Sequence, residues 1–331
     1  MVSTRAWQQS HTCGRPDVGK LRNSGMYKAF FGLKENPFNV NPDPHFLYRT
    51  RDTEEALACL TYGVQRRRGF IMLTGEVGTG KTTVLNKFLE WLRGERVATA
   101  YIFNSKLTVN QFLHFTMEDF GIHCASLSKS QVLLQLNQWL LERYRGGETA
   151  VLIVDEAQNL SPEVLEEIRL LTNLETATEK LLQIVLAGQP ELELILKQPA
   201  LRQLRQRITL RCKMVPLSFE DAQGYITERL RIAGANSEPI FSAEAIEAIF
   251  RYSTGIPRVI NLLCEHALIS AFAEGKRPVG SDIIDTVARE FELDTPPVAA
   301  VEPAKGEKVV TPMVDSLQNL GQVMDRMRNG K

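Results

Sequence analysis

The segment LTGEVGTGKTT, residues 73–83, constrains this chain more than any other part of its sequence. It matches the pattern GxxxxGK[ST] and stands directly after an apolar run and before a helical pattern, the context that a phosphate-binding loop requires. Glycines allow backbone amides to turn inward around phosphates, and the N-terminus of the following helix adds partial positive charge. We therefore expect a bound nucleoside triphosphate, contacted by Gly75, Glu76, Val77, Gly78, Thr79, Gly80, Lys81, Thr82 and Thr83.

Two side chains of this loop and two later carboxylates are expected to carry the chemistry. Lys81 would reach the β and γ phosphates of ATP, and the Thr82 hydroxyl would bind Mg²⁺. The run AVLIVDE ends in Asp155, a second expected Mg²⁺ ligand, and in Glu156, which is placed to polarise the attacking water. Taken alone, an Asp-Glu pair after a strand is equally typical of a helix cap. Together with the phosphate loop, it favours ATP hydrolysis over simple storage.

Apolar runs alternate with amphipathic helical patterns from residue 70 to residue 215, which is typical of a parallel sheet covered by helices. Between the runs lie segments such as SPEVLEEIRLL, where Ser161 is a good N-cap and Pro162 occupies the first helical position. The pattern predicts an α/β fold, a three-layer P-loop NTPase with a parallel sheet. The expected strands are 70–75, 98–104, 150–156, 181–188 and 208–215.

After Pro216 the strand-like runs end and only helical patterns follow. Ser218, Ser242 and Ser281 are the expected N-caps, and glycines mark the helix ends at Gly234, Gly255 and Gly275. We predict an ATPase core over 26–215 and an all-helical domain over 216–294. Its expected helices are 218–233, 242–252, 257–275 and 281–293.

The two ends of the chain differ from this pattern. Residues 1–25 are polar and predict a disordered extension, with Met26 as the expected natural start. Residues 295–312 are rich in proline and small side chains and predict a linker. In 313–331, apolar residues recur at alternating spacings of four and three, which is typical of a short amphipathic helix for a partner; a frayed tail is the alternative.

Composition excludes some classes of protein. The chain has 39 basic and 39 acidic residues, so its net charge does not indicate a nucleic-acid partner. No uncharged apolar stretch is long enough to predict a membrane span. Five cysteines are scattered without metal-ligand spacing, so a reducing cytoplasm, in which thiols stay unpaired, fits best.

The ordered motifs resemble the AAA+ ATPases of the ExeA type, also called general secretion pathway protein A. The resemblance runs from Met26 to about Glu292. It rests on MYKAFFGLKENPFNVNPDPHFLY, GEVGTGKTT, LIVDEAQNL, LAGQPEL, LRQRI and STGIPRVIN, in this order. It implies an AAA+ fold in which the helical domain acts as a lid over the nucleotide.

The resemblance also implies roles for residues whose chemistry alone is ambiguous. Gln189 corresponds to the polar sensor of the γ phosphate, and Asn104 to a residue that can hold the catalytic glutamate idle. Arg258 in GIPR corresponds to the lid arginine that reaches the phosphates. Arg207 corresponds to the arginine finger that completes a neighbouring subunit's site, with Arg205 as the competing candidate, so hydrolysis is expected to need a homo-oligomer, a ring or a filament.

Two aromatic residues are candidates for the adenine pocket, because aromatic faces stack on purines. They are Phe38 and Tyr48, and core packing is an equal alternative for Phe38.

The work that hydrolysis drives has three readings. The resemblance implies assembly of a secretion or pilus apparatus by a cytoplasmic ATPase, with peripheral attachment to the inner membrane as a further option. The second reading is a regulator of the transposition type that binds duplex DNA, because ATPases of that type share the DEAQ and GxPR style of site. Further support is limited to the basic cluster QRRRG at 65–69, which is also typical of a solvated helix end. The third is a slow nucleotide switch.

Overall fold

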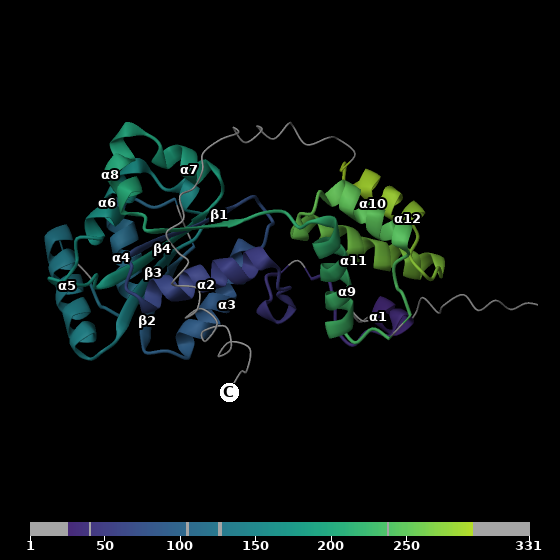
Figure 1. Cartoon of the computed structure of the whole chain (residues 1–331), viewed down its shortest axis with the longest axis horizontal. Helices are drawn as coiled ribbons and strands as arrows, with labels where there is room; N and C mark the ends of the chain where they lie inside the picture. The colour runs from purple at the N-terminus through teal and green to yellow at the C-terminus, as the bar shows by residue number, and fades with distance from the viewer. Residues whose placement is uncertain (1–25, 40, 104–105, 125–127, 237, 294–331) are drawn as a thin grey trace, which may run out of the picture.

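The computed structural model shows an α/β core joined to a helical lid (Figure 1). The predicted extension 1–25, linker 295–312 and tail 313–331 lie outside the described residues, as does Asn104. The structure describes residues 26–39, 41–103, 106–124, 128–236 and 238–293.

The core is built on one five-stranded sheet with the order β2-β3-β4-β1-β5, and every neighbouring pair is parallel. All five strands predicted from the apolar runs are present, most of them a residue or two shorter than expected. Parallel strands end at the same edge of a sheet, so the carboxyl ends of β1, β3 and β4 lie together. The strands are β1 (Phe70–Gly75), β2 (Val97–Ile102), β3 (Thr149–Val154), β4 (Leu182–Gly188) and β5 (Leu210–Met214).

Side chains alternate between the two faces of the sheet, and each face has its own apolar cluster. On β1, Ile71 and Leu73 pack toward α2 (Arg51–Gln65) and α3 (Lys81–Arg93). Phe70 and Met72 pack on the other face. That face is covered by α4 (Val109–Asp119), α5 (Lys129–Arg145), α6 (Pro162–Leu171), α7 (Glu191–Leu196) and α8 (Arg202–Arg207).

The helix caps agree with the sequence at three of four positions. The side chains of Ser161, Ser218 and Ser242 each accept a hydrogen bond from the backbone N–H of the residue three positions later. The prediction for Ser281 is wrong, because Ser281 is the first helical residue and Gly280 is the N-cap. The Asp282 carboxylate occupies the space beside that cap, since a Cβ on Gly280 would lie 2.6 Å from its Oδ1.

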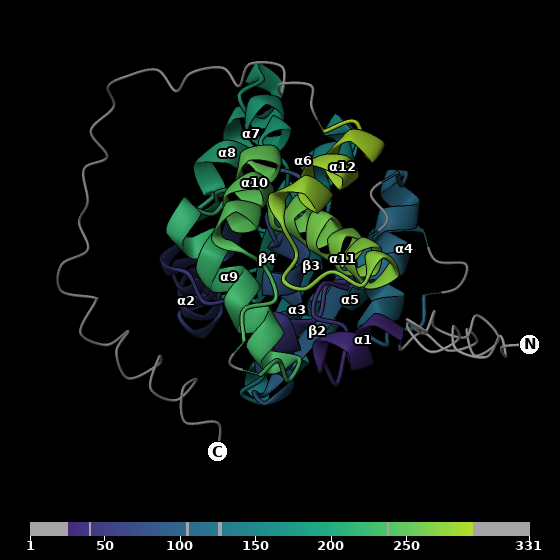
Figure 2. The same ribbon diagram turned by 90° about the vertical axis from the view of Figure 1, so that its right-hand side faces the viewer.

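The lid consists of α9 (Phe219–Ile232), α10 (Ala243–Ser253), α11 (Pro257–Glu274) and α12 (Ser281–Glu290). The first described helix, α1 (Met26–Phe31), packs against α11 and belongs to the same apolar cluster (Figures 1 and 2). Residues 26–38, which the sequence placed with the core, therefore pack on the lid through Tyr27, Phe31, Leu33 and Phe38. Their apolar spacing did not show which domain would cover them.

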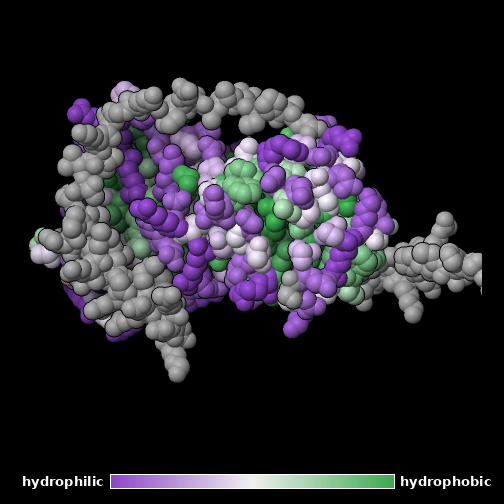
Figure 3. All heavy atoms as spheres, turned by 45° about the vertical axis from the view of Figure 1, so that its right-hand side comes forward, coloured by the Kyte–Doolittle hydropathy of each residue, from purple (hydrophilic) through white to green (hydrophobic). Residues whose placement is uncertain are grey.

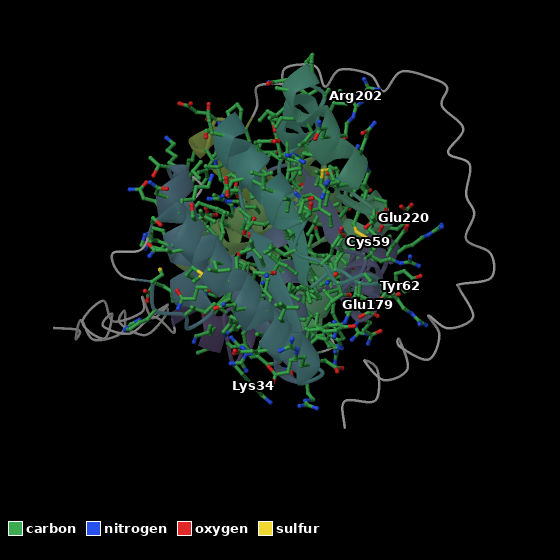
Figure 4. All side chains as sticks on the ribbon, turned by 90° about the vertical axis from the view of Figure 1, so that its left-hand side faces the viewer. Lys34, Cys59, Tyr62, Glu179, Arg202 and Glu220 are labelled. Carbon is green, nitrogen blue, oxygen red and sulfur yellow. A yellow bond between two sulfur atoms is a disulfide. The ribbon has the colours of Figure 1, made fainter. Side chains whose placement is uncertain are left out.

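Two features outside the fold prediction concern the cysteines and the surface. Cys59 of α2 and Cys212 of β5 form a disulfide, whereas Cys124 and Cys264 are buried thiols. The disulfide (Figure 4) departs from the unpaired thiols that the sequence analysis expected.

In Figure 3 the visible surface is mostly hydrophilic, with small hydrophobic patches. Within the described ranges, none of the helices has the length and apolarity needed to cross a membrane.

Gly255 fixes the junction between core and lid. It follows α10 in a left-handed conformation, with φ of 78°, and its carbonyl accepts a hydrogen bond of 2.8 Å from the Leu217 amide. A Cβ at this position would lie 2.1 Å from the Leu217 carbonyl oxygen. The chain that leaves the core thus passes directly over this glycine.

We predict that Gly255→Ala destabilises the protein more than Gly275→Ala, a matched change at another left-handed helix end with open space around it. Backbone strain costs about 1–2 kcal/mol in both variants. The overlap with Leu217 adds about 1–3 kcal/mol in the first. Urea unfolding of the two variants measures the difference, and equal losses of stability would contradict the role of this contact.

Candidate nucleotide site

The phosphate loop connects the end of β1 to the start of α3. Gly78 and Gly80 have φ angles of 81° and 97°, which side chains rarely adopt. Gly75 is required for space, because a Cβ there would lie 2.7 Å from the Met214 carbonyl oxygen of β5. The Thr79 hydroxyl donates to the Glu76 carbonyl at 2.8 Å. The predicted glycines therefore permit the tight backbone turn that a phosphate-binding loop requires.

Lys81 lies at the mouth of this loop and is only 6% exposed. Its Nζ donates to the carbonyl oxygens of Gly75, at 2.7 Å, and Glu76, at 3.0 Å. Burial lowers the pKa of Lys81, and the nearby Glu156 and Asp155 carboxylates oppose that shift. An ammonium group held by two neutral carbonyls is ready to pair with an anionic phosphate.

Asp155 follows β3 and faces the first turn of α3. Its Oδ2 accepts hydrogen bonds from the Thr82 hydroxyl, at 3.3 Å, and from the Tyr101 hydroxyl, at 2.9 Å. Its Oδ1 accepts from the Glu156 amide at 2.9 Å. Asp155 is 5% exposed, and among the described residues it has no ion pair. A buried carboxylate beside a hydroxyl, with only neutral donors around it, fits Mg²⁺, a hard cation that prefers oxygen ligands.

Sequence reasoning missed Tyr101. It belongs to β2 and lies in register with Ile153 of β3, so its place beside Asp155 follows from the strand order alone. Burial and the Asp155 charge raise the pKa of Tyr101, which keeps its hydroxyl protonated as a donor. Tyr101 therefore holds the same carboxylate oxygen that faces Thr82.

Glu156 comes next, in a left-handed conformation with φ of 52°. Its Oε2 accepts hydrogen bonds from the side-chain amides of Gln158, at 2.6 Å, and Gln189, at 3.2 Å. The structure thus brings the predicted glutamate after β3 together with the predicted polar residue after β4. Gln158 was part of the LIVDEAQNL motif but had no role in the sequence analysis.

The lid touches the loop through the start of α11. The Arg258 amide donates to the Gly78 carbonyl at 3.2 Å, and a Cβ on Gly78 would lie 2.7 Å from the Cβ of Arg258. The two domains enclose a pocket of about 340 Å³. It is lined by Asn41, Pro42, Asp43, Val77, Gly78, Gly80, Lys81, Thr82, Thr83, Glu156, Tyr225, Arg229, Pro257, Arg258 and Asn261.

Arg229 of α9 is a second residue that sequence reasoning missed. It lines this pocket, is 6% exposed, and donates from Nε to the Pro37 carbonyl at 2.6 Å. Its guanidinium also lies over the Phe46 ring at 4.8 Å and bonds to the Tyr225 hydroxyl. Among the described residues it has no carboxylate partner, so a bound phosphate would supply charge that the protein lacks there.

The two aromatic candidates for the adenine pocket lie in different surroundings. Phe38 is fully buried in the lid cluster, where its ring meets Phe241, so core packing is the correct reading for it. Tyr48 lines a small cavity of about 50 Å³ beside the phosphate loop, together with Gly80 and Pro257.

The arginine candidates lie away from this pocket, on α8. Arg207 donates to the Thr172 hydroxyl of its own chain, while Arg205 is exposed. Figure 4 shows Arg202, at the start of the same helix, at the outer edge of the core. Neither candidate contacts the pocket of its own subunit.

The strand order, the phosphate loop and the helical lid define a P-loop protein of the AAA+ ATPase class. The family model described as "AAA domain" matches residues 64–196. Over 266 residues, 80% of this chain, the sequence is 47% identical to General secretion pathway protein A of Aeromonas hydrophila, of which the chain spans 48%. The resemblance to ExeA-type ATPases inferred from the motifs is thus confirmed.

Solved structures agree on the fold. The chain superimposes on Cdc6p from Pyrobaculum aerophilum with a TM-score of 0.62 and 18% identity, covering 78% of this chain and 71% of that one. The Drosophila origin recognition complex bound to DNA gives a TM-score of 0.60 and 19% identity, covering 87% and 70%. At these identities the similarity establishes the fold alone.

We predict that Tyr101→Phe weakens Mg²⁺ binding, because Asp155 Oδ2 loses the shorter of its two hydrogen bonds. Changes behind a metal ligand typically lower metal affinity about 10- to 100-fold. Fluorescent ADP titrated with Mg²⁺ measures this without turnover. The control is Tyr62→Phe on α2, whose hydroxyl accepts from Arg68 at the surface (Figure 4). Unchanged Mg²⁺ dependence in Tyr101→Phe would overturn the assignment.

Proposed function

We propose that this chain hydrolyses ATP with Mg²⁺ at the interface between its own copies, and that hydrolysis drives assembly of a secretion or pilus-type apparatus. The observation that carries the proposal is Glu156, held beside Gln189 at the rim of the phosphate loop. A protein that only stored nucleotide would not need a carboxylate for water at this place.

In the proposed reaction, the backbone of residues 75–80 and Lys81 bind the phosphates, while Thr82 and Asp155 hold Mg²⁺. The metal, when bound, neutralises charge on the phosphate oxygens. Glu156 accepts a proton from water as the water attacks the γ phosphate, Gln189 senses that phosphate, and Arg258 brings the lid toward it.

The interface is proposed from the arginines of α8. A finger that acts on a neighbour's ATP can raise the rate on the order of 10³ to 10⁵. Arg207 is the proposed finger, although it must first leave the Thr172 hydroxyl. Arg205 is the alternative because its side chain is already exposed.

The work assigned to hydrolysis follows the relative's name. General secretion pathway protein A is 47% identical, but the chain spans about half its length, so the target proteins and the cellular place remain part of the proposal. We place the activity in the cytoplasm, where ATP is available, with peripheral contact at the inner membrane.

Binding to duplex DNA is the second candidate, favoured by the fold shared with an origin recognition complex solved on DNA. Its sequence support is weakened by the structure, because Arg67 of the basic cluster pairs with Glu179 and lies over the Tyr144 ring within the chain. DNA binding that weakens steeply with added salt would favour this candidate.

We predict that Glu156→Gln lowers turnover about 100-fold or more while ATP stays bound, because general bases typically contribute about 10² to 10⁴ in rate. The same variant should stabilise the ATP-bound oligomer in sedimentation. Lys81→Ala is the contrasting variant and should lose ATP binding itself. Full turnover in Glu156→Gln would exclude the assigned base.

A mixing experiment tests the finger. Glu156→Gln and Arg207→Ala should each be nearly inactive alone, yet a mixture should regain activity, because the first supplies an intact arginine to the second's intact site. Specific activity should also rise with protein concentration. Rescue in a mixture with Arg205→Ala, but not with Arg207→Ala, would assign the finger to Arg205. A rate independent of concentration would support a slow switch instead.

A further inference from the structure

We infer that Gln158 is a positioning residue that fixes the orientation of the Glu156 carboxylate and links it to Gln189. This inference rests on the proposed ATPase function and deepens it, since it concerns how the catalytic base stays oriented while the sensor responds to phosphate.

The three residues form a closed set of hydrogen bonds. Gln158 Nε2 donates to Glu156 Oε2 at 2.6 Å, and Gln189 Nε2 donates to the same oxygen at 3.2 Å. The Gln189 backbone amide donates to Gln158 Oε1 at 3.0 Å. Gln158 therefore uses both ends of its amide, the donor on the carboxylate and the acceptor on the backbone. Only a side chain with both functions satisfies the two partners.

The fold is shaped around this amide. The left-handed turn at Glu156 leads into the short helix η3 (Ala157–Asn159), which directs Gln158 back toward β4. At the end of β4, a Cβ on Gly188 would lie 2.8 Å from Gln158 Oε1. Gly188 does not have a positive φ, so it is needed there for space and not for backbone conformation. Gly188 thus provides the room in which the Gln158 amide lies.

Two donors on one carboxylate oxygen have a consequence for the reaction. They anchor Oε2, which leaves Oε1 as the oxygen that meets the attacking water. When the Gln189 amide turns toward the γ phosphate, Glu156 loses one anchor. Gln158 keeps the other, because its own acceptor bonds to the backbone of Gln189 and not to its side chain. The base thus stays aligned when the sensor engages its ligand.

The test compares Gln158→Ala, Gln158→Glu and wild type for kcat, KM and binding of a non-hydrolysable ATP analogue. Loss of one hydrogen bond to a charged group predicts a kcat lower by about 10- to 100-fold, with KM and analogue affinity unchanged within about 2-fold. Gln158→Glu keeps the size of the side chain but cannot donate, so it should lose at least as much. Near-normal kcat in Gln158→Glu would mean that only the shape matters and would overturn the inference.

Two further variants serve as a second perturbation of the Gln158 amide and as a surface control. Gly188→Ala leaves Gln158 in the chain but displaces its amide, and should lower kcat without changing analogue affinity. Gln138→Ala, on the exposed side of α5, is the surface control and should change neither. Glu156→Gln is assayed in parallel. If it loses turnover while Gln158→Ala does not, the inference alone fails; if it retains turnover, the proposed function fails as well.

Discussion

Parallel pairing of β1 with β4, and of β4 with β3, is the constraint on which the rest of this structure depends. Because all three strands end at one edge, the loop after β1, the acidic pair after β3 and the polar residue after β4 come within hydrogen-bonding distance. Sheet hydrogen bonds and an apolar cluster on each face of the sheet support that edge.

The lid contacts the same edge without being part of the sheet. Gly78 lies so close to Arg258 that any side chain on it would displace the start of α11. On the far side of the pocket, Arg229 holds the Pro37 carbonyl, so residues 26–38 are bound to the lid and not to the core. The pocket is lined by both core and lid residues, so a nucleotide bound there would contact both domains, and binding could then favour one arrangement of the domains over another.

The site contains buried groups of both positive and negative charge, which suits a ligand that also carries charges of both signs. Lys81 and Arg229 are buried cations held by neutral groups, and Asp155 is a buried carboxylate held by two hydroxyls and an amide. Buried charges are costly unless a partner compensates them, and under the proposed function a metal-bound triphosphate would supply charge of both signs here.

The sequence by itself determined the elements that depend on short-range rules. Glycine spacing defined the phosphate loop, apolar runs defined five strands, and serines marked helix starts, failing only at Ser281, where Asp282 fills the space beside the cap. Ordered motifs singled out Gln189 and Arg258 as candidates, and the structure places Gln189 beside Glu156 and Arg258 in the lining of the pocket. Only the tertiary structure placed Tyr101 beside Asp155, joined Gln158 to Gln189, paired Cys59 with Cys212 and packed α1 on the lid. These contacts join residues far apart in the chain, and apolar periodicity shows that a face is buried without showing what buries it.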